Sequence, residues 1–215
     1  MALKVNEIFY SIQGESSYAG YPCVFVRLTG CNLRCSYCDT QYAYEHGDQL
    51  EIEQILEKVR TYQCSIVEIT GGEPLSQEDT PLFATRLLDE NFTVLVETNG
   101  SMDIDRVDRR CVRVVDVKCP SSGEAASFDR ENLAKLTSND ELKFVIGDRA
   151  DYDHAVQMLG EMKKERFSAG HTHFSPVFGS IDPKELANWI LADHLRVRLG
   201  FQLHKIIWDS ATRGV

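Results

Sequence analysis

Short β-rich apolar runs alternate along most of the chain with amphipathic helical patterns, and this alternation is the strongest constraint on the fold. Strands are predicted at Val24–Leu28, Ile66–Thr70, Phe92–Glu97, Val112–Val117, Leu142–Ile146, His173–Val177 and Leu203–Trp208. Helices are predicted at Glu51–Arg60, Pro81–Asp89, Ala150–Glu165 and Pro183–Leu191. Because a helical crossover returns the chain to the same edge of a sheet, such strands pair in parallel. We predict an α/β fold with about six parallel strands, arranged as an open, partial β/α barrel or a curved doubly wound sheet.

Length and linker content indicate one domain. The 215 residues are too few for a complete eight-unit barrel of the usual size. No Gly/Ser-rich or Pro-rich stretch separates one part of the chain from another. We expect a single domain over residues 1–215.

Charge and hydropathy exclude two classes of partner. The chain has 23 Lys and Arg against 33 Asp and Glu, a net charge of −10, which is the wrong sign for binding a phosphate backbone. We therefore expect no direct nucleic-acid partner. No apolar run is long enough to cross a bilayer, and Lys4, Asn6 and Glu7 within Met1–Tyr10 lead us to expect no secretory leader. We expect a cytoplasmic protein that does not enter the membrane.

Three of the seven cysteines form a C-x-x-x-C-x-x-C loop directly after the first predicted strand, at Cys31, Cys35 and Cys38. In a reducing compartment such a group indicates a metal centre, and thiolates select zinc, copper(I) or iron–sulfur clusters. No histidine lies nearby to complete a tetrahedral site, so one coordination position is left open, as catalytic metals require. A structural zinc site with a distant ligand such as Cys23 or Cys64 is the alternative. Cys23, Cys64 and Cys111, which lie in or beside apolar runs, are interpreted as core residues.

Polar and glycine-containing segments follow four of the predicted strands. Because the carboxyl ends of parallel strands meet at one edge of a sheet, we expect these segments to surround one cavity. They are Thr70–Pro74, Glu97–Gly100, Lys118–Pro120 and Ser175–Pro176.

The cysteine loop, with an aromatic residue before its last cysteine and Gly71-Gly72-Glu73-Pro74 downstream, resembles the radical S-adenosylmethionine (SAM) superfamily. A narrower resemblance, to the 7-carboxy-7-deazaguanine synthases, extends from Val5 to about Trp208. The cysteine loop identifies only the superfamily, whereas the opening motif and Asp39-Thr40 are specific to the narrower family. The matching segments are Phe9–Glu15, Arg27, Cys38-Asp39-Thr40, Glu97–Gly100 and His204-Lys205.

The resemblance implies a radical SAM enzyme of the queuosine pathway. The family converts 6-carboxy-5,6,7,8-tetrahydropterin into 7-carboxy-7-deazaguanine with loss of ammonia. It uses SAM and a 4Fe–4S cluster, which Cys31, Cys35 and Cys38 would hold, and a Mg²⁺ ion, which Thr40 would bind. The resemblance further implies a homodimer and an electron donor of the flavodoxin or ferredoxin type.

The resemblance also assigns the remaining site residues. Substrate contacts fall at Ile12, Gln13, Gly14, Glu15, Arg27, Thr70 and His204. The planar guanidinium of Arg27 is suited to donate two parallel hydrogen bonds to the substrate carboxylate. The chain departs from some members by continuing with Asp209–Val215, where Ser210 or the terminal carboxylate would reach the substrate. SAM contacts fall at Tyr37, Cys38, Asp39, Gly72, Glu73, Thr98, Asp116, Val117, Lys118, Ser175, Pro176, Val177 and Phe178.

Two other functions fit parts of the sequence. An activase that abstracts hydrogen from a glycine of a partner protein would share the cysteine loop, but it would need neither Mg²⁺ nor a carboxylate-binding Arg27. A non-catalytic zinc or electron-transfer module would share the thiolates and would not cleave SAM.

We predict that Cys35→Ala abolishes SAM cleavage, because a cluster that loses one of three thiolate ligands is not held in the geometry that leaves one iron open. The measurement is dithionite-driven methionine release after anaerobic reconstitution. Cleavage that persists in this variant would refute the cluster assignment.

Overall fold

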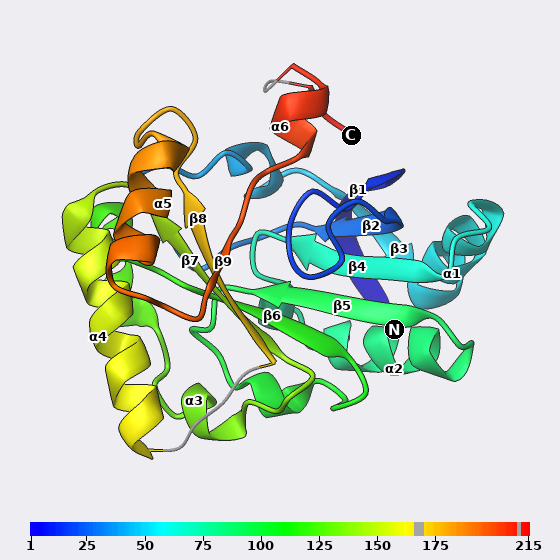
Figure 1. The fold of residues 1–215 in the computed structure, drawn as a ribbon. Helices are drawn as coiled ribbons and strands as arrows, with labels where there is room; N and C mark the ends of the chain where they lie inside the picture. The colour runs from blue at the N-terminus through cyan, green and yellow to red at the C-terminus, as the bar shows by residue number, and fades with distance from the viewer. Residues whose placement is uncertain (166–169, 210–211) are drawn as a thin grey trace.

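The computed structural model describes residues 1–165, 170–209 and 212–215. Within these ranges one sheet has nine strands in the order β3-β1-β2-β4-β5-β6-β7-β8-β9, with β3 and β9 at separate edges (Figure 1). The antiparallel edge consists of β1 (Ala2–Ile12), β2 (Pro22–Leu28) and β3 (Asp48–Glu51). Parallel pairing runs from β2 through β4 (Ile66–Gly71), β5 (Thr93–Thr98), β6 (Val112–Val117), β7 (Glu141–Ile146), β8 (His171–Pro176) and β9 (Arg198–Leu199).

Helices form the crossovers between the parallel strands. In Figure 1, α2 lies on one side of the sheet, and α6 lies on the other, near β1. Among the described residues, none of the helices has the length and apolar character needed to span a bilayer. The helices are α1 (Ile52–Thr61), α2 (Thr80–Asp89), α3 (Asn132–Lys135), α4 (Arg149–Glu165), α5 (Pro183–Ala192) and α6 (His204–Ile207). Short 3-10 turns occupy Gln41–Ala43, Pro74–Ser76, Ile104–Arg106, Pro120–Ser122 and Ala125–Ser127.

The open, partial barrel and six of the seven predicted strands are confirmed, and the four predicted helices agree to within a residue or two. The strand predicted at Leu203–Trp208 is wrong. Most of this run is the short helix α6, closed by hydrogen bonds from Ile207 N to Leu203 O at 2.9 Å and from Trp208 N to His204 O at 3.0 Å. A short apolar run does not distinguish a strand from a helical turn, and here β8 already pairs with β9.

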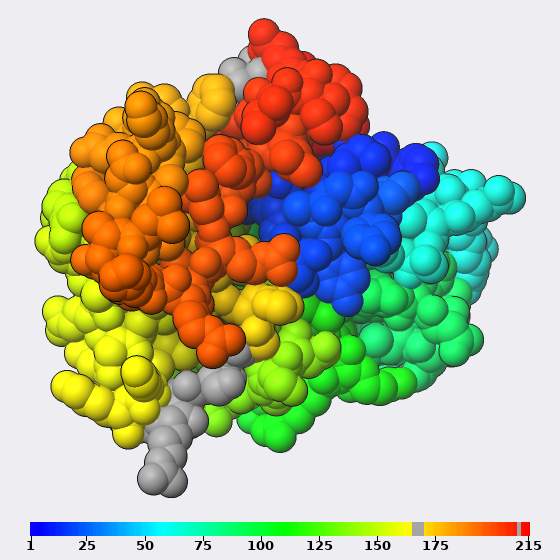
Figure 2. All heavy atoms as spheres, viewed as in Figure 1, coloured from blue at the N-terminus to red at the C-terminus, as the bar shows by residue number. Residues whose placement is uncertain are grey.

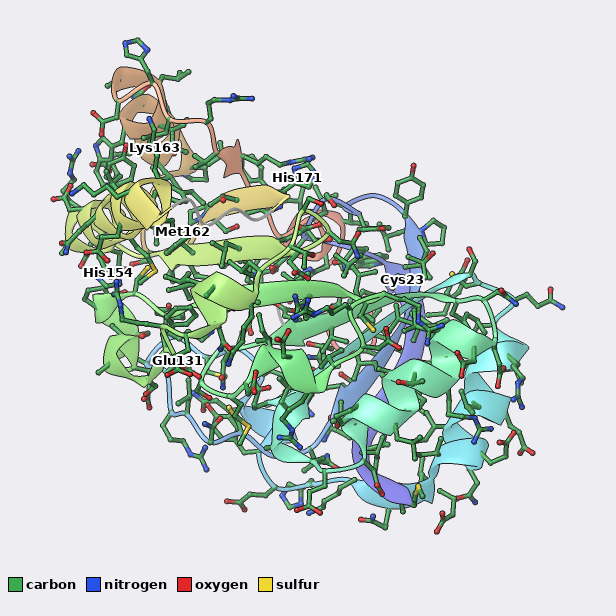
Figure 3. The ribbon with its side chains drawn as sticks, turned by 90° about the horizontal axis from the view of Figure 1, so that it is seen from below. Cys23, Glu131, His154, Met162, Lys163 and His171 are labelled. Atoms are coloured by element: carbon green, nitrogen blue, oxygen red, sulfur yellow. The ribbon has the colours of Figure 1, made fainter. Side chains whose placement is uncertain are left out.

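Side chains alternate between the two faces of the sheet, as strand geometry requires. Toward the helices, residues such as Val26, Ile69 and Phe144 are fully buried and form one continuous core with α1, α2, α4 and α5. Met162 on α4, labelled in Figure 3, belongs to this core. On the opposite, inner face nearly every parallel strand carries an ionisable residue: Arg27, Glu68, Glu97, Asp116, Lys143 and His173. The fold therefore has an apolar outer layer and a polar inner face.

Helix ends follow from local sequence. Asp182 accepts a hydrogen bond from Lys184 N at 2.8 Å and Pro183 occupies the first turn of α5, which fixes the start of that helix. At the start of α1, Glu51 and Gln54 form a reciprocal capping box. These signals explain why the helix boundaries were predictable.

A buried ion pair ties β6 to the segment before β7. Arg113 and Asp140 are each 1% exposed, and the Arg113 Nη2–Asp140 Oδ2 distance is 2.6 Å. Asp140 also accepts from Thr137 N at 2.7 Å, so it holds the turn that leads into β7. The pair thereby sets the relative position of two strands that carry inner-face charges.

We expect Asp140→Ala to lower the free energy of unfolding by about 3–5 kcal/mol, because the buried Arg113 cation then keeps only the partly exposed Asp105 as an ion-pair partner. Urea-induced unfolding followed by circular dichroism measures the change. Arg110→Ala, which breaks an exposed ion pair with Asp108, is the control and should alter stability little. Equal effects of the two substitutions would contradict the structural role of the buried pair.

Candidate functional site

A cavity of about 820 Å³ opens on the inner face at the carboxyl ends of the strands. Its size lies in the upper part of the range for small-molecule sites, which leaves room for two ligands side by side. An N-terminal segment and the C-terminal segment close one side: blue and red atoms pack together in Figure 2. Leu203 N donates to Gly14 O at 3.0 Å at this junction.

The cysteine loop forms one wall of the cavity. Cys31, Cys35 and Cys38 are half-buried, and all three line the cavity. Backbone contacts fix the loop, since Gly30 N donates to Ala43 O at 2.9 Å and Cys38 N to Cys35 O at 3.2 Å. The loop also contacts the segment after β6. There Ser36 N donates to Ser122 O at 3.0 Å, and Arg34 N donates to Glu124 Oε1 at 2.8 Å.

The thiols of this loop suit a polynuclear cluster. Burial raises the pKa of Cys31 and Cys35, so these thiols carry protons until a metal displaces them. No three His, Cys, Asp or Glu side chains in the described ranges are grouped closely enough for a single metal ion. A cubane cluster binds each thiolate on a different iron and takes sulfurs that stand further apart. The donor set therefore fits 4Fe–4S better than zinc.

The Gly-Gly-Glu-Pro segment packs tightly behind that loop. Gly71 has a φ of 146°, and a Cβ there would overlap Leu28 O, while a Cβ at Gly72 would overlap Gly30 O. Glu73 is fully buried, and its carboxylate accepts hydrogen bonds from Thr98 Oγ1 at 2.8 Å and Asn99 N at 2.7 Å. Glu73 thus lies behind the cavity wall, where it joins the ends of β4 and β5.

Lys143 is the centre of a buried charge network on the inner face. Its Nζ lies 2.7 Å from Glu15 Oε2 and 3.7 Å from Asp116 Oδ2, and it also pairs with Glu97. Burial alone would raise the pKa of Glu15, but the charge and hydrogen bond of Lys143 outweigh it and lower that pKa. Lys118, paired with Asp116 at 2.7 Å, adds a second buried cation.

Glu68 differs from the other carboxylates in this network. Burial, followed by the neighbouring charge of Glu97, raises the pKa of Glu68 well above its usual value, so the neutral acid is favoured. The side-chain Nε2 of Gln13 donates a hydrogen bond to the Glu68 carboxylate. The Oε1 of Gln13 accepts a hydrogen bond from Glu15 N at 2.9 Å. Gln13 therefore connects the N-terminal loop to β4.

Arg27 lies on β2 between two aromatic rings. Its Nε donates to Glu7 Oε1 at 2.7 Å, and its guanidinium carbon is 5.9 Å from the centroids of Phe9 and Tyr42. Tyr42 also donates to Glu7 at 2.9 Å, which fixes that carboxylate. No described residue accepts from the terminal nitrogens of Arg27, so these donors are available to an anion in the cavity.

Asp39 and Thr40 leave the cysteine loop beside the C-terminal helix. Thr40 Oγ1 donates to Asp39 Oδ1 at 3.0 Å, and Lys205 Nζ lies 2.6 Å from Asp39 Oδ2. Burial would raise the pKa of Asp39, but the hydrogen bond and charge of Lys205 hold it at about 2. Burial lowers the pKa of neighbouring His204, which favours the neutral imidazole at this corner.

Most residues singled out from the sequence lie on this one cavity. Those lining it are Ile12, Gln13, Gly14, Glu15, Arg27, Tyr37, Cys38, Asp39, Thr40, Thr70, Gly72, Thr98, Asp116, Lys118, Val177, Phe178 and His204. Val117 is buried in the core, Pro176 is not among the lining residues, and Ser175 lines a smaller cavity of about 150 Å³. Ser210 lies outside the described residues, whereas Thr212–Val215 line the main cavity.

Sequence reasoning did not single out Glu68 or Lys143 as site residues, nor the tail residue Arg213. A signal for the first two was present, because each is a charged residue in the middle of an apolar strand run. Cys23 and Cys111, interpreted as core residues, are fully buried, and Cys64 packs against the core; Cys23 is labelled in Figure 3.

The cavity also retains a polar atom that needs a partner. Asp116 Oδ1 is buried and accepts no hydrogen bond within the described part of the chain. Buried acceptors are nearly always satisfied, so this atom fits a ligand with hydroxyl or amino donors, such as SAM. The oxygen of Thr40 is likewise a suitable hard donor for Mg²⁺.

Comparisons with known proteins agree with this geometry. The family model of the radical SAM superfamily matches residues 25–190. A 7-carboxy-7-deazaguanine synthase of Koribacter versatilis is 45% identical over 227 residues, covering 99% of this chain and all of that protein. The synthase of Chlorobaculum tepidum is 44% identical, covering 99% of this chain and 97% of that one. The crystal structure of QueE from Escherichia coli, 21% identical, superposes with a TM-score of 0.77 over 94% of each chain.

We expect Lys143→Met to lower the free energy of unfolding by about 3 kcal/mol or more near neutral pH, because the surrounding carboxylates lose their buried counter-ion. In the wild type the lowered pKa of Glu15 contributes stability that is present above the unfolded carboxyl pKa and lost as the pH falls. In the variant, protonation relieves carboxylate repulsion.

In urea unfolding experiments the difference between wild type and variant should therefore shrink as the pH falls through and below about 4.5, the ordinary pKa of a glutamate such as Glu15. Lys184→Met, at an exposed position on α5, is the control. A pH-independent difference would argue against the charge network.

Proposed function

The chain belongs to the radical SAM superfamily and, within it, to the 7-carboxy-7-deazaguanine synthases, and from this premise we propose how its residues serve the reaction. The enzyme is a radical SAM lyase that converts 6-carboxy-5,6,7,8-tetrahydropterin into 7-carboxy-7-deazaguanine with loss of ammonia. The observation that carries the residue assignment is that the three thiols, Arg27 and Thr40 line one cavity. We assign the whole span of residues 1–215 to a single domain.

The cluster end of the cavity is assigned to the cysteine loop. Cys31, Cys35 and Cys38 hold the 4Fe–4S cluster, which together with SAM supplies the one-electron chemistry for hydrogen abstraction. The protein positions SAM and excludes water from it. The unsatisfied Asp116 Oδ1 and the buried Lys118 beside it support polar contacts to SAM on this wall. Tyr37, Asp39, Gly72, Thr98 and residues 175–178 complete the assignment, with Glu73 and Val117 supporting the wall from behind.

The substrate end is assigned to the N-terminal loop and α6. Arg27 binds the substrate carboxylate with its terminal nitrogens, and the flanking rings of Phe9 and Tyr42 hold its guanidinium in place. Glu15 and the backbone of Ile12–Gly14 meet the amino-pyrimidinone edge. A Cβ at Gly14 would overlap the His204 ring, so the loop and α6 enclose the substrate together. Thr70 and the tail residues 212–215 complete this end.

A Mg²⁺ ion is assigned to Thr40, next to the substrate carboxylate. Magnesium retains several waters and takes few protein oxygens, so one hydroxyl and the substrate carboxylate are a reasonable set. Asp39, which accepts the Thr40 hydroxyl proton, orients that oxygen.

The reaction needs a one-electron donor, which we assign to a protein of the flavodoxin or ferredoxin type. The resemblance to the family implies a homodimer. All seven cysteines are free thiols, which supports a reducing, cytoplasmic setting. The net charge of −10 supports a site for a small molecule over one for nucleic acid.

An anaerobic assay with the carboxypterin, SAM and a reductant tests the assignment. The deazaguanine product is expected to form with Mg²⁺ and to fall when Mg²⁺ is removed by a chelator. Product formation that does not respond to the chelator would argue against the metal site while leaving the reaction itself intact.

We expect Arg27→Ala to lower kcat/KM for the carboxypterin by about 10- to 100-fold, the loss of a charge-assisted hydrogen bond of about 1.5–3 kcal/mol. Slow, uncoupled SAM cleavage should remain, because the cluster wall is not altered. Arg86→Ala, which removes an exposed arginine on α2, is the control. Equal loss of both activities would contradict the assigned role of Arg27.

A further inference from the structure

We propose that Lys205 is a positioning residue that makes metal binding at Thr40 depend on the substrate carboxylate. The inference rests on the assignment of Mg²⁺ to Thr40 and concerns how tightly, and when, that ion binds. Lys205 touches neither the metal nor the substrate in this proposal. It acts through Asp39.

The ammonium group of Lys205 is held in place on Asp39. Its Nζ lies 2.6 Å from Asp39 Oδ2 and 5.4 Å from the centroid of the Phe178 ring. The Lys205 side chain is 10% exposed, although its partner is 52% exposed. The helix that carries it is anchored, because Gln202 donates to Glu15 at 2.7 Å and Leu203 N to Gly14 O at 3.0 Å.

Both oxygens of the Asp39 carboxylate are engaged. Oδ2 accepts from Lys205, and Oδ1 accepts from the Thr40 hydroxyl at 3.0 Å. Since the Thr40 proton points to Asp39, the lone pairs of Thr40 Oγ1 are left for a cation. The arrangement therefore leaves the neutral Thr40 hydroxyl available to the metal. The Asp39 carboxylate, which would be the stronger ligand, is occupied by its two hydrogen bonds.

The two carboxylates at this corner, Asp39 and Glu7, are each paired with a cation without a metal. Asp39 is neutralised by Lys205, and Arg27 by Glu7. Arg213, whose guanidinium lies 4.1 Å from the Tyr42 ring centroid, adds a further cation nearby. A divalent ion thus meets no uncompensated negative charge from these groups, and Mg²⁺ gives up hydration water only for strong oxygen donors. The substrate carboxylate supplies the missing anion.

Metal and substrate should therefore bind with positive coupling, and by linkage each strengthens the other equally. Removing the Lys205 charge frees Asp39 to attract the ion directly. The metal then binds before the substrate, and the coupling decreases.

The test measures Mn²⁺ uptake by the cluster-loaded protein with SAM and without reductant, so that no turnover occurs. Free Mn²⁺ is read from its EPR signal, with and without the carboxypterin. In the wild type we expect the substrate to tighten Mn²⁺ binding by about tenfold or more. In Lys205→Met we expect binding without substrate to tighten by about tenfold, and the substrate effect to shrink accordingly.

Three variants make the outcome specific. Lys205→Arg keeps the charge and should behave like the wild type. Asp39→Asn combined with Lys205→Met removes the freed anion and should return metal binding without substrate to the weak wild-type level. Thr40→Ala should abolish substrate-dependent uptake, and its failure to do so would refute the metal assignment itself.

The proposal about Lys205 is overturned if Thr40→Ala abolishes uptake while Lys205→Met leaves both Mn²⁺ affinities unchanged. It is also overturned if Lys205→Arg behaves like Lys205→Met, because the role would then depend on side-chain shape and not on charge. Circular dichroism and SAM binding, measured on every variant, identify any substitution that disturbs the fold, and such a variant is replaced by Lys205→Gln.

Discussion

The buried ammonium of Lys143 is the interaction on which the inner face depends. It lies in β7, yet its carboxylate partners come from the N-terminal loop, β5 and β6 through Glu15, Glu97 and Asp116. Carboxylates gathered on an inner face repel one another unless a cation lies among them. The network lets a sheet whose outer face is largely apolar present polar side chains to its ligands on the inner face. Substrate recognition and the stability of the strand ends are therefore linked.

Much of the fold could be predicted, because its determinants are local. β-rich apolar runs and helical periodicity identified six strands and four helices, and the parallel pairing followed from the alternation of strands and helices. The antiparallel strands β1 and β3 were not predicted: β1 mixes polar residues such as Lys4 and Asn6 with its apolar ones, and β3 has only four residues. The pairing of β1 with β2 and β3 is a long-range property that no local sequence pattern encodes.

The site was predictable where chemistry dictates residue type and spacing, and less so where burial decides the role. Cys31, Arg27 and Thr40 were identified by motif and line the cavity. Glu73, from the same class of motif, turned inward to accept hydrogen bonds from the end of β5 and from Leu75 N. The charged residues of the strand interiors were overlooked because an isolated Glu or Lys in an apolar run gives no indication of its partner. Their pairing required the register of neighbouring strands, as in Asp116 opposite Lys143.

The junction between the N-terminal loop and α6 has a consequence for biosynthesis. Gln202 lies 187 residues after Glu15, yet the two side chains share a hydrogen bond at the edge of the cavity. A ribosome releases the cysteine loop early and the last residues of the pocket much later, so a nascent chain has its thiols well before it has an enclosed pterin site. Loading of iron and sulfur, and acquisition of substrate selectivity, are thus separable in time during the making of the enzyme.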